Sequence, residues 1–453
     1  MENIIFRKKN RKITNFSPTR VIVASFATLI LVSGTLLNLP MASNDGQSIG
    51  FLNAIFTATS AACVTGLVVA DTLTQWTLFG QIVIIFTIQI GGLGIVTFAT
   101  FFSILLGRRV SMKGRVLAQE SLNYFTYDGV LNLIKNIVLI TFYIEFVGAL
   151  LLASRFAPQY GAKGVYMAVF QSISAFCNAG FDLMGGYKSL TAYNNDPIVI
   201  YTTALLIIMG GLGFMVWRDL YENPRLKNLH LQTKLVLIMT GSLIFIGALF
   251  FLLVEFNNPL TMGPLDFMEK INAAIFHSVT CRTAGFNSLS TNDMSEVSKI
   301  GTVLLMFIGA APGSTGGGIK VTTAGVIIMA IVSNIKGLDD TIILKRKVPR
   351  EVVNKALSIA GLSITIIFIM TTIITGVEHI NFINVLYEVT SAFGTVGLST
   401  GITPNLHAVS KMLLIFTMFL GRVGPLTFAI AIAMRAHKEH ENIVYPEGKI
   451  VVG

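Results

Sequence analysis

The stretch T-S-A-F-G-T-V-G-L-S-T-G, at Thr390–Gly401, decides how the rest of the chain is interpreted. Thr395, Val396 and Gly397 lie at its centre, and glycine permits backbone angles that a side chain forbids. Four converging loops of this T-V-G type are the known way to replace the water shell of a potassium ion with backbone carbonyl oxygens. One loop cannot form such a ring, so the chain must contain three more or assemble with copies of itself.

Three further stretches share the pattern of an aromatic residue, a serine or threonine, and a glycine followed by leucine or phenylalanine. They are F-T-A-T-S-A-A-C-V-T-G-L at Phe56–Leu67, F-Q-S-I-S-A-F-C-N-A-G-F at Phe170–Phe181 and F-H-S-V-T-C-R-T-A-G-F at Phe276–Phe286. The third is one residue shorter between its aromatic residue and its glycine. The pattern recurs roughly every 110 residues, and a regular internal period indicates repeats rather than chance recurrence among 41 glycines.

The composition is that of an integral membrane protein. The chain is 53% hydrophobic and 12% charged, with a mean hydropathy of +0.71, whereas soluble domains carry about twice that charge. Apolar runs longer than about 18 residues recur, as in membrane helices. The net charge of +10 comes from basic residues in short loops between these runs, so it indicates the positive-inside rule and no nucleic-acid partner. No nucleophile–base pair or metal-spaced His/Cys cluster is visible, so the chain is not expected to be an enzyme.

Each repeat is predicted as a span, a short helix that enters the membrane and turns back, a glycine loop and a second span. The fold class is therefore an all-α membrane protein with four span–pore-loop–span repeats around a central pseudo-fourfold pore. The predicted divisions are a cytoplasmic N-terminus at 1–18, repeat 1 at 19–125, repeat 2 at 126–230, repeat 3 at 231–350, repeat 4 at 351–436 and a cytoplasmic tail at 437–453.

The distribution of charge predicts the orientation in the cell membrane. Basic residues follow each of the first three repeats, so these ends and both termini are expected in the cytoplasm, and the glycine loops enter from outside. Acidic residues predicted on the outer side either raise the cation concentration at a pore mouth or belong to ordinary solvated loops: Asp182, Asp196, Glu255, Asp266, Asp293 and Glu378.

The four glycine loops are predicted to form a cation filter. Irregular backbone at membrane depth persists only where protein or water satisfies its polar groups, and the C-terminal end of each short helix would present a negative dipole end to a cation. The carbonyls expected to line the path belong to Val64, Thr65, Gly66, Asn178, Ala179, Gly180, Thr283, Ala284, Gly285, Thr395, Val396 and Gly397.

The second span of the third repeat departs from the others, which are predicted to continue as helices. It reads G-A-A-P-G-S-T-G-G-G-I-K at residues 309–320, and five glycines with one proline cannot hold a regular helix. The segment is either a flexible plug beneath the filter or a static kink. Arg422 stands at the matching place in the fourth repeat, and a charge at membrane depth marks function by default; it could anchor the plug or set an electrostatic barrier. The predicted gate residues are Gly309, Pro312, Gly313, Ser314, Thr315, Gly316, Gly317, Gly318, Lys320 and Arg422.

The motifs C-V-T-G-L, C-N-A-G-F, R-T-A-G-F and G-T-V-G-L, the broken third-repeat span and the late arginine resemble the superfamily of potassium transporters that includes the Trk, Ktr and plant HKT proteins. The resemblance covers nearly the whole chain and is closest to the Ktr-type membrane subunits, KtrB and KtrD. It implies potassium uptake, often sodium-dependent, by a homodimer in membrane lipid on a cytoplasmic RCK ring of the KtrA or KtrC type. Nucleotide control is then expected only through that ring. Glycine at all four filter positions favours K⁺ over Na⁺.

A sodium-coupled secondary cation transporter, with broken helices around a midplane site, is the alternative. The broken span suits both functions. Fourfold repetition of one loop motif favours the channel-like subunit, because inverted repeats are expected of the transporter.

Overall fold

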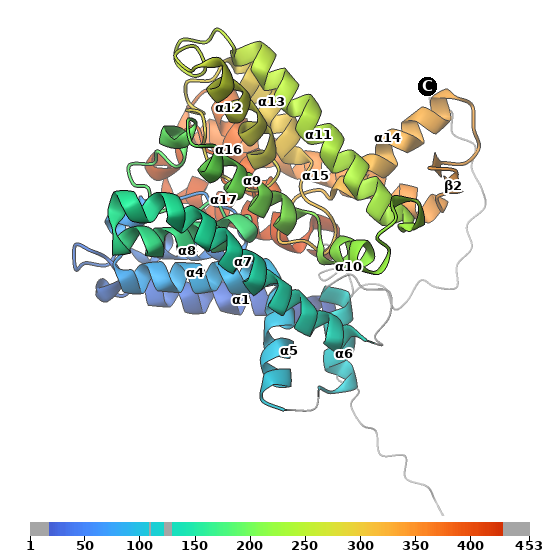
Figure 1. Cartoon of the computed structure of the whole chain (residues 1–453), viewed down its shortest axis with the longest axis horizontal. Coiled ribbons are helices and arrows are strands. Elements are labelled where there is room, and N and C mark those ends of the chain that lie inside the picture. The colour runs from blue at the N-terminus through green and yellow to red at the C-terminus, as the bar shows by residue number, and fades with distance from the viewer. Residues whose placement is uncertain (1–17, 108–109, 122–128, 429–453) are drawn as a thin grey trace, which may run out of the picture.

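The computed structural model of the chain describes residues 18–107, 110–121 and 129–428. The predicted N-terminal segment and the predicted tail therefore lie almost wholly outside the described residues. The prediction that both termini face the cytoplasm concerns those same residues. Within the described residues nearly all regular structure is helical, apart from one small hairpin of β1 (Ile342–Ile343) and β2 (Arg346–Lys347). The all-α class is confirmed (Figure 1).

The same order of a long helix, a short helix and further helices occurs four times. The first set is α1 (Pro18–Leu37), α2 (Phe51–Ala62), α3 (Thr72–Gln75), α4 (Leu78–Leu93), α5 (Ile95–Leu105) and α6 (Met112–Ser121). The second is α7 (Val130–Tyr160), α8 (Ala162–Phe176), η2 (Thr191–Tyr193), α9 (Pro197–Gly211) and α10 (Phe214–Glu222). The third is η3 (Leu226–Asn228), α11 (Leu231–Glu255), α12 (Phe267–Thr280), α13 (Glu296–Phe307) and α14 (Val321–Ile335). The fourth is α15 (Arg350–Glu378), α16 (Phe382–Gly394), η4 (Thr403–Asn405) and α17 (Ala408–Val423); η1 (Pro40–Ala42) follows α1.

The helix lengths separate crossing helices from re-entrant ones. In the part of the chain described, α1, α7, α11 and α15 are each long and apolar enough to cross a membrane. The short helices α2, α8, α12 and α16 have only 12 to 15 residues, and at 1.5 Å per residue they cannot cross a core of about 30 Å. With the bent pairs α4–α5 and α9–α10 each counted as one, there are up to six spans, so the predicted eight remain a prediction.

The expectation that the second spans of the first two repeats continue as straight helices is wrong. α4 and α5 meet at 96°, and α9 and α10 meet at 90°. The bends occur at Gly94 and Gly213, whose φ angles of 85° and 89° are unfavourable for residues with a side chain. In the fourth repeat α17 likewise ends at Gly424, with φ of 94°. Among the described residues the third repeat is therefore not the only one with a broken second span. Its break differs from the others in being longer.

The second span of each repeat packs on the short helix of the next repeat, and the second span of the fourth repeat packs on the short helix of the first. Tyr201 of α9 donates to Asn272 of α12 at 2.7 Å. Equivalent contacts join Lys299 of α13 to Asn384 of α16 at 3.4 Å, and Lys411 of α17 to Asn53 of α2 at 3.3 Å. α4 likewise packs on α8. The last repeat therefore contacts the first.

Two regions project from this arrangement (Figure 1). Beyond the bend at Gly94, α5 lies beside α6 at one end of the molecule. α14 projects elsewhere and carries the hairpin, whose turn residues Leu344 and Lys345 both have positive φ. Such angles at both central positions are those of a type I′ turn, which matches the twist of a two-stranded ribbon.

Candidate functional site

The four repeat glycines form a closed ring. A Cβ atom added to any of these glycines would lie less than 3.0 Å from a carbonyl oxygen, which is closer than real Cβ atoms approach. In each case the oxygen belongs to the residue just before the glycine of the next repeat. The distances would be 2.6 Å from Gly66 to Ala179 O, 2.9 Å from Gly180 to Ala284 O, 2.5 Å from Gly285 to Val396 O and 2.2 Å from Gly397 to Thr65 O. All twelve predicted filter residues are buried. The sequence reasoning therefore named residues that the fold brings together; we refer to residues 64–66, 178–180, 283–285 and 395–397 as the glycine segments.

The backbone of the glycine segments repeats one unusual conformation. The first residue of each has positive φ: 57° at Val64, 59° at Asn178, 70° at Thr283 and 50° at Thr395. The glycine two residues later is positive as well, between 70° and 94°. In an ordinary extended chain successive carbonyls point to opposite sides, and reversing alternate angles turns them to one side. Non-glycine residues at positive φ carry strain that persists where the surroundings impose it, often at functional sites.

Serine residues accept hydrogen bonds from backbone amides in or directly after three of the segments. Ser60 Oγ accepts from Gly66 N at 3.0 Å, and Ser391 Oγ accepts from Gly397 N at 3.0 Å. Ser174 Oγ accepts from Phe181 N at 3.1 Å. The carbonyls of the same serines accept the amides of Thr65, Ala179 and Val396, each at 2.8 Å. The sequence pattern included a serine or threonine in each stretch but assigned it no role, and each of these three serines stands six residues before its repeat glycine.

The third segment is held differently because it is one residue shorter. The amide of Ala284 donates to the Thr280 carbonyl at 3.0 Å. The buried side chain of Arg282 donates to Thr240 Oγ1 of α11 at 3.3 Å. The partner of Arg282 is thus a hydroxyl on the neighbouring long helix.

Residues 308–320, here called the third-repeat loop, leave the helical path between α13 and α14 and return to it. Ile308 and Ile319 pair side by side, and Gly309 N donates to Ile319 O at 2.8 Å. Lys320 Nζ donates to Gly316 O at 2.7 Å across the base of the loop. These bonds give several backbone polar groups of this irregular segment partners within the protein, as membrane depth requires.

The far side of the third-repeat loop is bonded to the second repeat. Thr315 Oγ1 donates to Phe176 O, at the end of α8, at 3.1 Å. The backbone amide of Thr315 donates to Gly210 O at 3.2 Å, and Ala311 N donates to Gly211 O at 3.0 Å. Phe214 N, just past the bend at Gly213, donates to Gly313 O at 2.9 Å. The bend that the sequence analysis missed therefore provides a partner for the loop.

The tip of the third-repeat loop also touches two glycine segments. Gly317 N donates to Thr395 Oγ1 at 3.1 Å. A Cβ on Gly317 would lie 2.4 Å from that hydroxyl, and one on Gly316 would lie 2.2 Å from Thr283 Oγ1. The absence of side chains here lets the loop pack directly against the ends of the segments that adjoin the short helices.

Arg422 links three repeats through its guanidinium group. One terminal nitrogen donates to Thr315 O in the third-repeat loop, and the other donates to Gly91 O in the first repeat. The second nitrogen also lies 3.2 Å from Gly92 O. The rigid fork of five N–H donors suits arginine to bridging several carbonyls at once. The structure therefore contains a contact between Arg422 and the third-repeat loop, and the other predicted gate residues belong to that loop.

A buried carboxyl group that sequence reasoning missed lies behind this bridge. Glu145, in the middle of α7, is 4% exposed and accepts from Gln89 Nε2 of α4 at 3.0 Å. Cys177, just after α8, places its sulfur 3.6 Å from Gln89 Oε1. Gln89 is two residues before Gly91, so this cluster ties α7 and α8 to the helix end that Arg422 contacts. An acidic residue inside a 31-residue apolar helix was the available signal.

The acidic residues near the other end of the segments have structural partners. Asp196 accepts from Arg155 Nε at 2.6 Å, and Glu255 accepts from Ser295 and Thr261 at 2.7 and 2.6 Å. Glu388 of α16 accepts from Thr403 Oγ1 at 2.8 Å and holds the chain beyond the fourth segment.

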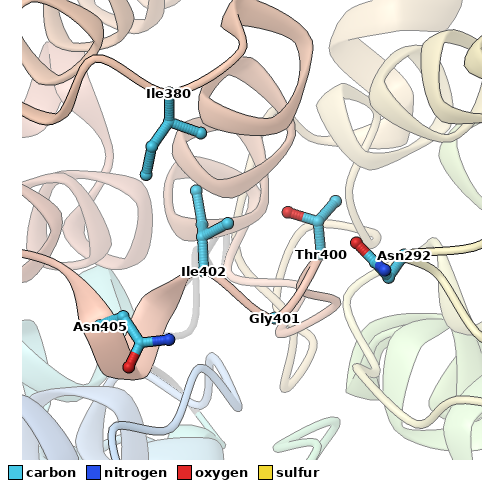
Figure 2. A pocket seen from close by; sticks show the side chains of 6 residues that line it. All are labelled: Asn292, Ile380, Thr400, Gly401, Ile402 and Asn405. Atoms are coloured by element: carbon cyan, nitrogen blue, oxygen red, sulfur yellow. The ribbon is translucent and has the colours of Figure 1, made fainter.

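Beside Glu388 a hollow of about 490 Å³ is lined by Asn292, Ile380, Thr400, Gly401, Ile402 and Asn405. Figure 2 shows Ile380 facing Ile402, and Asn292 beside Thr400.

Apolar helices long enough to cross a membrane, with shorter helices leading into a glycine ring among them, are typical of a membrane transport protein. Residues 3–442 match the family described as TrkH: cation transport protein, and the chain belongs to this family, whose members transport cations and are not enzymes.

Relatives are similar along their whole length. The Ktr system potassium uptake protein B of Bacillus subtilis (strain 168) is 42% identical, covering 98% of each chain. The potassium/sodium uptake protein NtpJ of Enterococcus hirae is 39% identical, covering 99% of this chain and all of the relative. The crystal structure of the potassium transporter TrkH from Vibrio parahaemolyticus superposes with a TM-score of 0.73 at 16% identity, over 93% of this chain and 86% of that one, and confirms the fold.

Proposed function

We propose that the chain is the ion-conducting membrane subunit of a bacterial Ktr-type potassium uptake system. The four glycine segments act as its selectivity filter, and the third-repeat loop and Arg422 act as its gate. The observation that carries the proposal is the closed ring of four glycines. Each glycine lies against the carbonyl oxygen of the residue that precedes the glycine of the next repeat. Inward carbonyls from four strands can replace the hydration shell of K⁺. The names of the relatives, potassium uptake and potassium/sodium uptake proteins, agree with this substrate.

The gate assignment rests on where the loop lies. It packs against Thr283 and Thr395, and it is bonded to repeats 2 and 4 and, through Arg422, to repeat 1. A segment held across one end of the filter by several separate contacts blocks the path until those contacts break. Because the hydrogen bonds are individually worth only about 1 kcal/mol, a cytoplasmic partner that pulls on α14 could release them.

Ion flux in proteoliposomes tests the function. The purified chain, reconstituted with its cytoplasmic ring, should carry K⁺ in preference to Na⁺, and without the ring the flux should be low. Flux that requires a fixed number of Na⁺ ions per K⁺ would instead support the sodium-coupled transporter. The fourfold ring disfavours that alternative, although the bends at Gly94 and Gly213 are the kind of broken helix that it uses.

The remaining parts of the proposal are a homodimer, cytoplasmic termini and control by a nucleotide-binding RCK ring. The hairpin is the feature that suits ring docking. Lys345 and Arg346 are exposed at and beside its turn, next to exposed Leu344, whereas Lys347 is paired with Asp340 at 2.7 Å. A short ribbon between α14 and α15 holds these charges in a defined place and connects them to the helix that follows the third-repeat loop.

Reversing the charges at Lys345 and Arg346 to glutamate should weaken ring association about tenfold or more, since each reversal turns an attraction into a repulsion across the interface. Pull-down of the ring and the nucleotide response of flux measure the effect. Reversal of Lys163 and Lys188, two exposed lysines predicted on the outer side, is the control. If the hairpin variant binds the ring as well as the parent protein does, the hairpin is not part of the docking surface.

A further inference from the structure

We infer that Glu145 is a positioning residue of the proposed gate: acting through Gln89, it holds the end of α4 so that the carbonyls of Gly91 and Gly92 face Arg422. Glu145 and Gln89 are called the polar pair below. The inference rests on the proposed function, because Arg422 is part of the proposed gate. It adds that the closed state depends on two side chains whose hydrogen bonds reach neither the glycine segments nor the third-repeat loop.

Glu145 is a buried carboxyl group that takes part in no ion pair within the described part of the chain. Its side chain is 4% exposed in the middle of α7 and accepts from Gln89 Nε2 at 3.0 Å. The Cys177 sulfur lies 3.9 Å from the same carboxyl group. An acidic side chain inside an apolar span is costly and marks function by default. An apolar residue would serve packing at lower cost.

The next repeat shows the same helix contact without a carboxyl group. Ser172 of α8 donates to Glu145 O at 2.7 Å, and Ser278 of α12 donates to Ile244 O of α11 at 2.8 Å. Both serines stand two residues after the aromatic residue of their repeat pattern, so Ile244 is the equivalent of Glu145. The short helix therefore packs on the long helix with either residue, and the carboxyl group of Glu145 is not needed for this packing.

The partner of Glu145 on the second span differs in the same way. A Cβ on Gly91 would lie 2.1 Å from the last carbonyl oxygen of α2, and one on Gly210 would lie 1.8 Å from the last carbonyl oxygen of α8. Gln89 and Ile208 each stand two residues before these glycines and are therefore equivalent. Two isoleucines, Ile208 and Ile244, thus take the place of the polar pair in the next repeat, and both pack against one hydrophobic cluster.

The ends of α4 and α9 differ in what their carbonyls accept. Gly91 O and Gly92 O accept from the guanidinium group of Arg422, whereas Gly210 O and Gly211 O accept from backbone amides of the third-repeat loop. Carbonyls in the last turn of a helix lack intrahelical partners and attract a cation. A single side chain that arrives from another repeat binds well only if these carbonyls are held in one direction. The polar pair occurs at the helix end that binds such a side chain.

The polar pair fixes the direction of these carbonyls through one turn of α4. Gln89 uses both ends of its amide, because Nε2 donates to Glu145 and Oε1 lies 3.6 Å from the Cys177 sulfur. A Cβ on Gly92 would lie 2.8 Å from that sulfur, so the turn packs closely there. Without Glu145, the buried Gln89 Nε2 has no partner, which costs more than the bond itself. We expect the turn to rotate and to carry the carbonyls of Gly91 and Gly92 away from Arg422.

Basal K⁺ flux of the full-length chain in proteoliposomes, without any ring, tests the inference. Glu145→Leu should raise this flux about three- to tenfold, the effect of about one hydrogen bond on the closed state. Glu145→Gln keeps an acceptor for Gln89 and should stay within about twofold of the parent. Combining Glu145→Ile with Gln89→Ile reproduces the isoleucine pair of the next repeat and leaves no buried amide unpaired. This double variant should raise flux to the same extent, and it keeps the test decisive if Glu145→Leu does not fold.

The effect should depend on Arg422. In the Arg422→Ala background, Glu145→Leu should change flux less than about twofold, because substitutions that remove the same contact do not add. A substitution that only loosened the fold would add to Arg422→Ala. Thr141→Val is the matched control. Thr141 lies one helical turn before Glu145 in α7 and is fully buried, and its hydroxyl has no hydrogen-bond partner among the described residues, so flux should be unchanged.

Parent-like flux in the double isoleucine variant, or a Glu145→Leu effect that persists in full in the Arg422→Ala background, would overturn the inference. The proposed gate has a separate readout. If Arg422→Ala raises flux and the Glu145 variants do not, the gate stands and Glu145 does not position it. If Arg422→Ala leaves flux unaltered, Arg422 is no part of the gate and the inference is lost with it.

Discussion

Deleting residues 312–317 is expected to raise basal cation flux at least about tenfold in the absence of any cytoplasmic partner. The deletion removes Thr315 and Gly317, and with them the bonds to Phe176, Gly210 and Thr395 and the carbonyl that Arg422 contacts. Three or more hydrogen bonds of about 1 kcal/mol each outweigh the 1.4 kcal/mol that corresponds to a factor of ten. Potassium uptake by proteoliposomes, normalised to reconstituted protein, measures the change.

Arg422→Ala should also raise basal flux, because the closed loop loses its attachment to the first repeat. The effects of the substitution and the deletion should not add, since both remove the same barrier. Arg225→Ala, which truncates an exposed arginine outside the bundle, is the matched control and should leave flux unchanged. Lower flux in the deletion variant at normal membrane abundance would mean that the third-repeat loop is a structural kink and that the gate lies elsewhere.

Gly66→Ser should reduce the preference for K⁺ over Na⁺ by about tenfold or more, which corresponds to 1.4 kcal/mol of differential binding. A Cβ at Gly66 would lie 2.6 Å from Ala179 O and 2.9 Å from Gly180 Cα, and the φ angle of 93° is itself unfavourable for serine. Both atoms belong to the adjacent segment of the ring, so the carbonyls of two strands must move. Competition between the two ions in uptake assays gives the ratio.

Gly46→Ser is the matched control for this prediction. Gly46 also has positive φ, of 68°, but nothing lies within 4 Å of its Cβ position. It therefore carries the cost of the backbone angle without the clash. Unchanged affinities for K⁺ and Na⁺ in a folded Gly66→Ser variant would remove the first glycine segment from the filter.

The periodic features of the fold could be predicted from the sequence. Hydropathy and the spacing of Gly66, Gly180, Gly285 and Gly397 indicated the short helices and the residues that meet in the ring, because a repeated local pattern implies repeated local structure. In the structure each of the four glycines lies against the carbonyl of the residue that precedes the next glycine of the ring. Their role in ion selection, the boundaries of the repeats and the symmetry around a pore stay predictions.

What could not be predicted depends on contacts between distant parts of the chain. Gly94 and Gly213 were interpreted as helical because the residues on both sides of each are apolar, and hydropathy does not record a change in helix direction. The partners of Arg422 lie more than one hundred residues away in sequence, and nothing local distinguishes Gly91 O from other carbonyls. Glu145 lies in an apolar helix far in sequence from Gln89, so its pairing was equally invisible.

The contact between the last repeat and the first has a consequence for biosynthesis. Lys411 reaches Asn53 across 358 positions, and the Cβ position of Gly397 touches Thr65 O. A ribosome produces the first three repeats well before the fourth, so α2 lacks its neighbour α17 during most of translation. Until α16 and α17 insert, the ring has an open side, and its carbonyls there need water or an insertion factor in place of protein. The nascent chain should therefore acquire its protease-resistant core only at the end of synthesis, in a single late step.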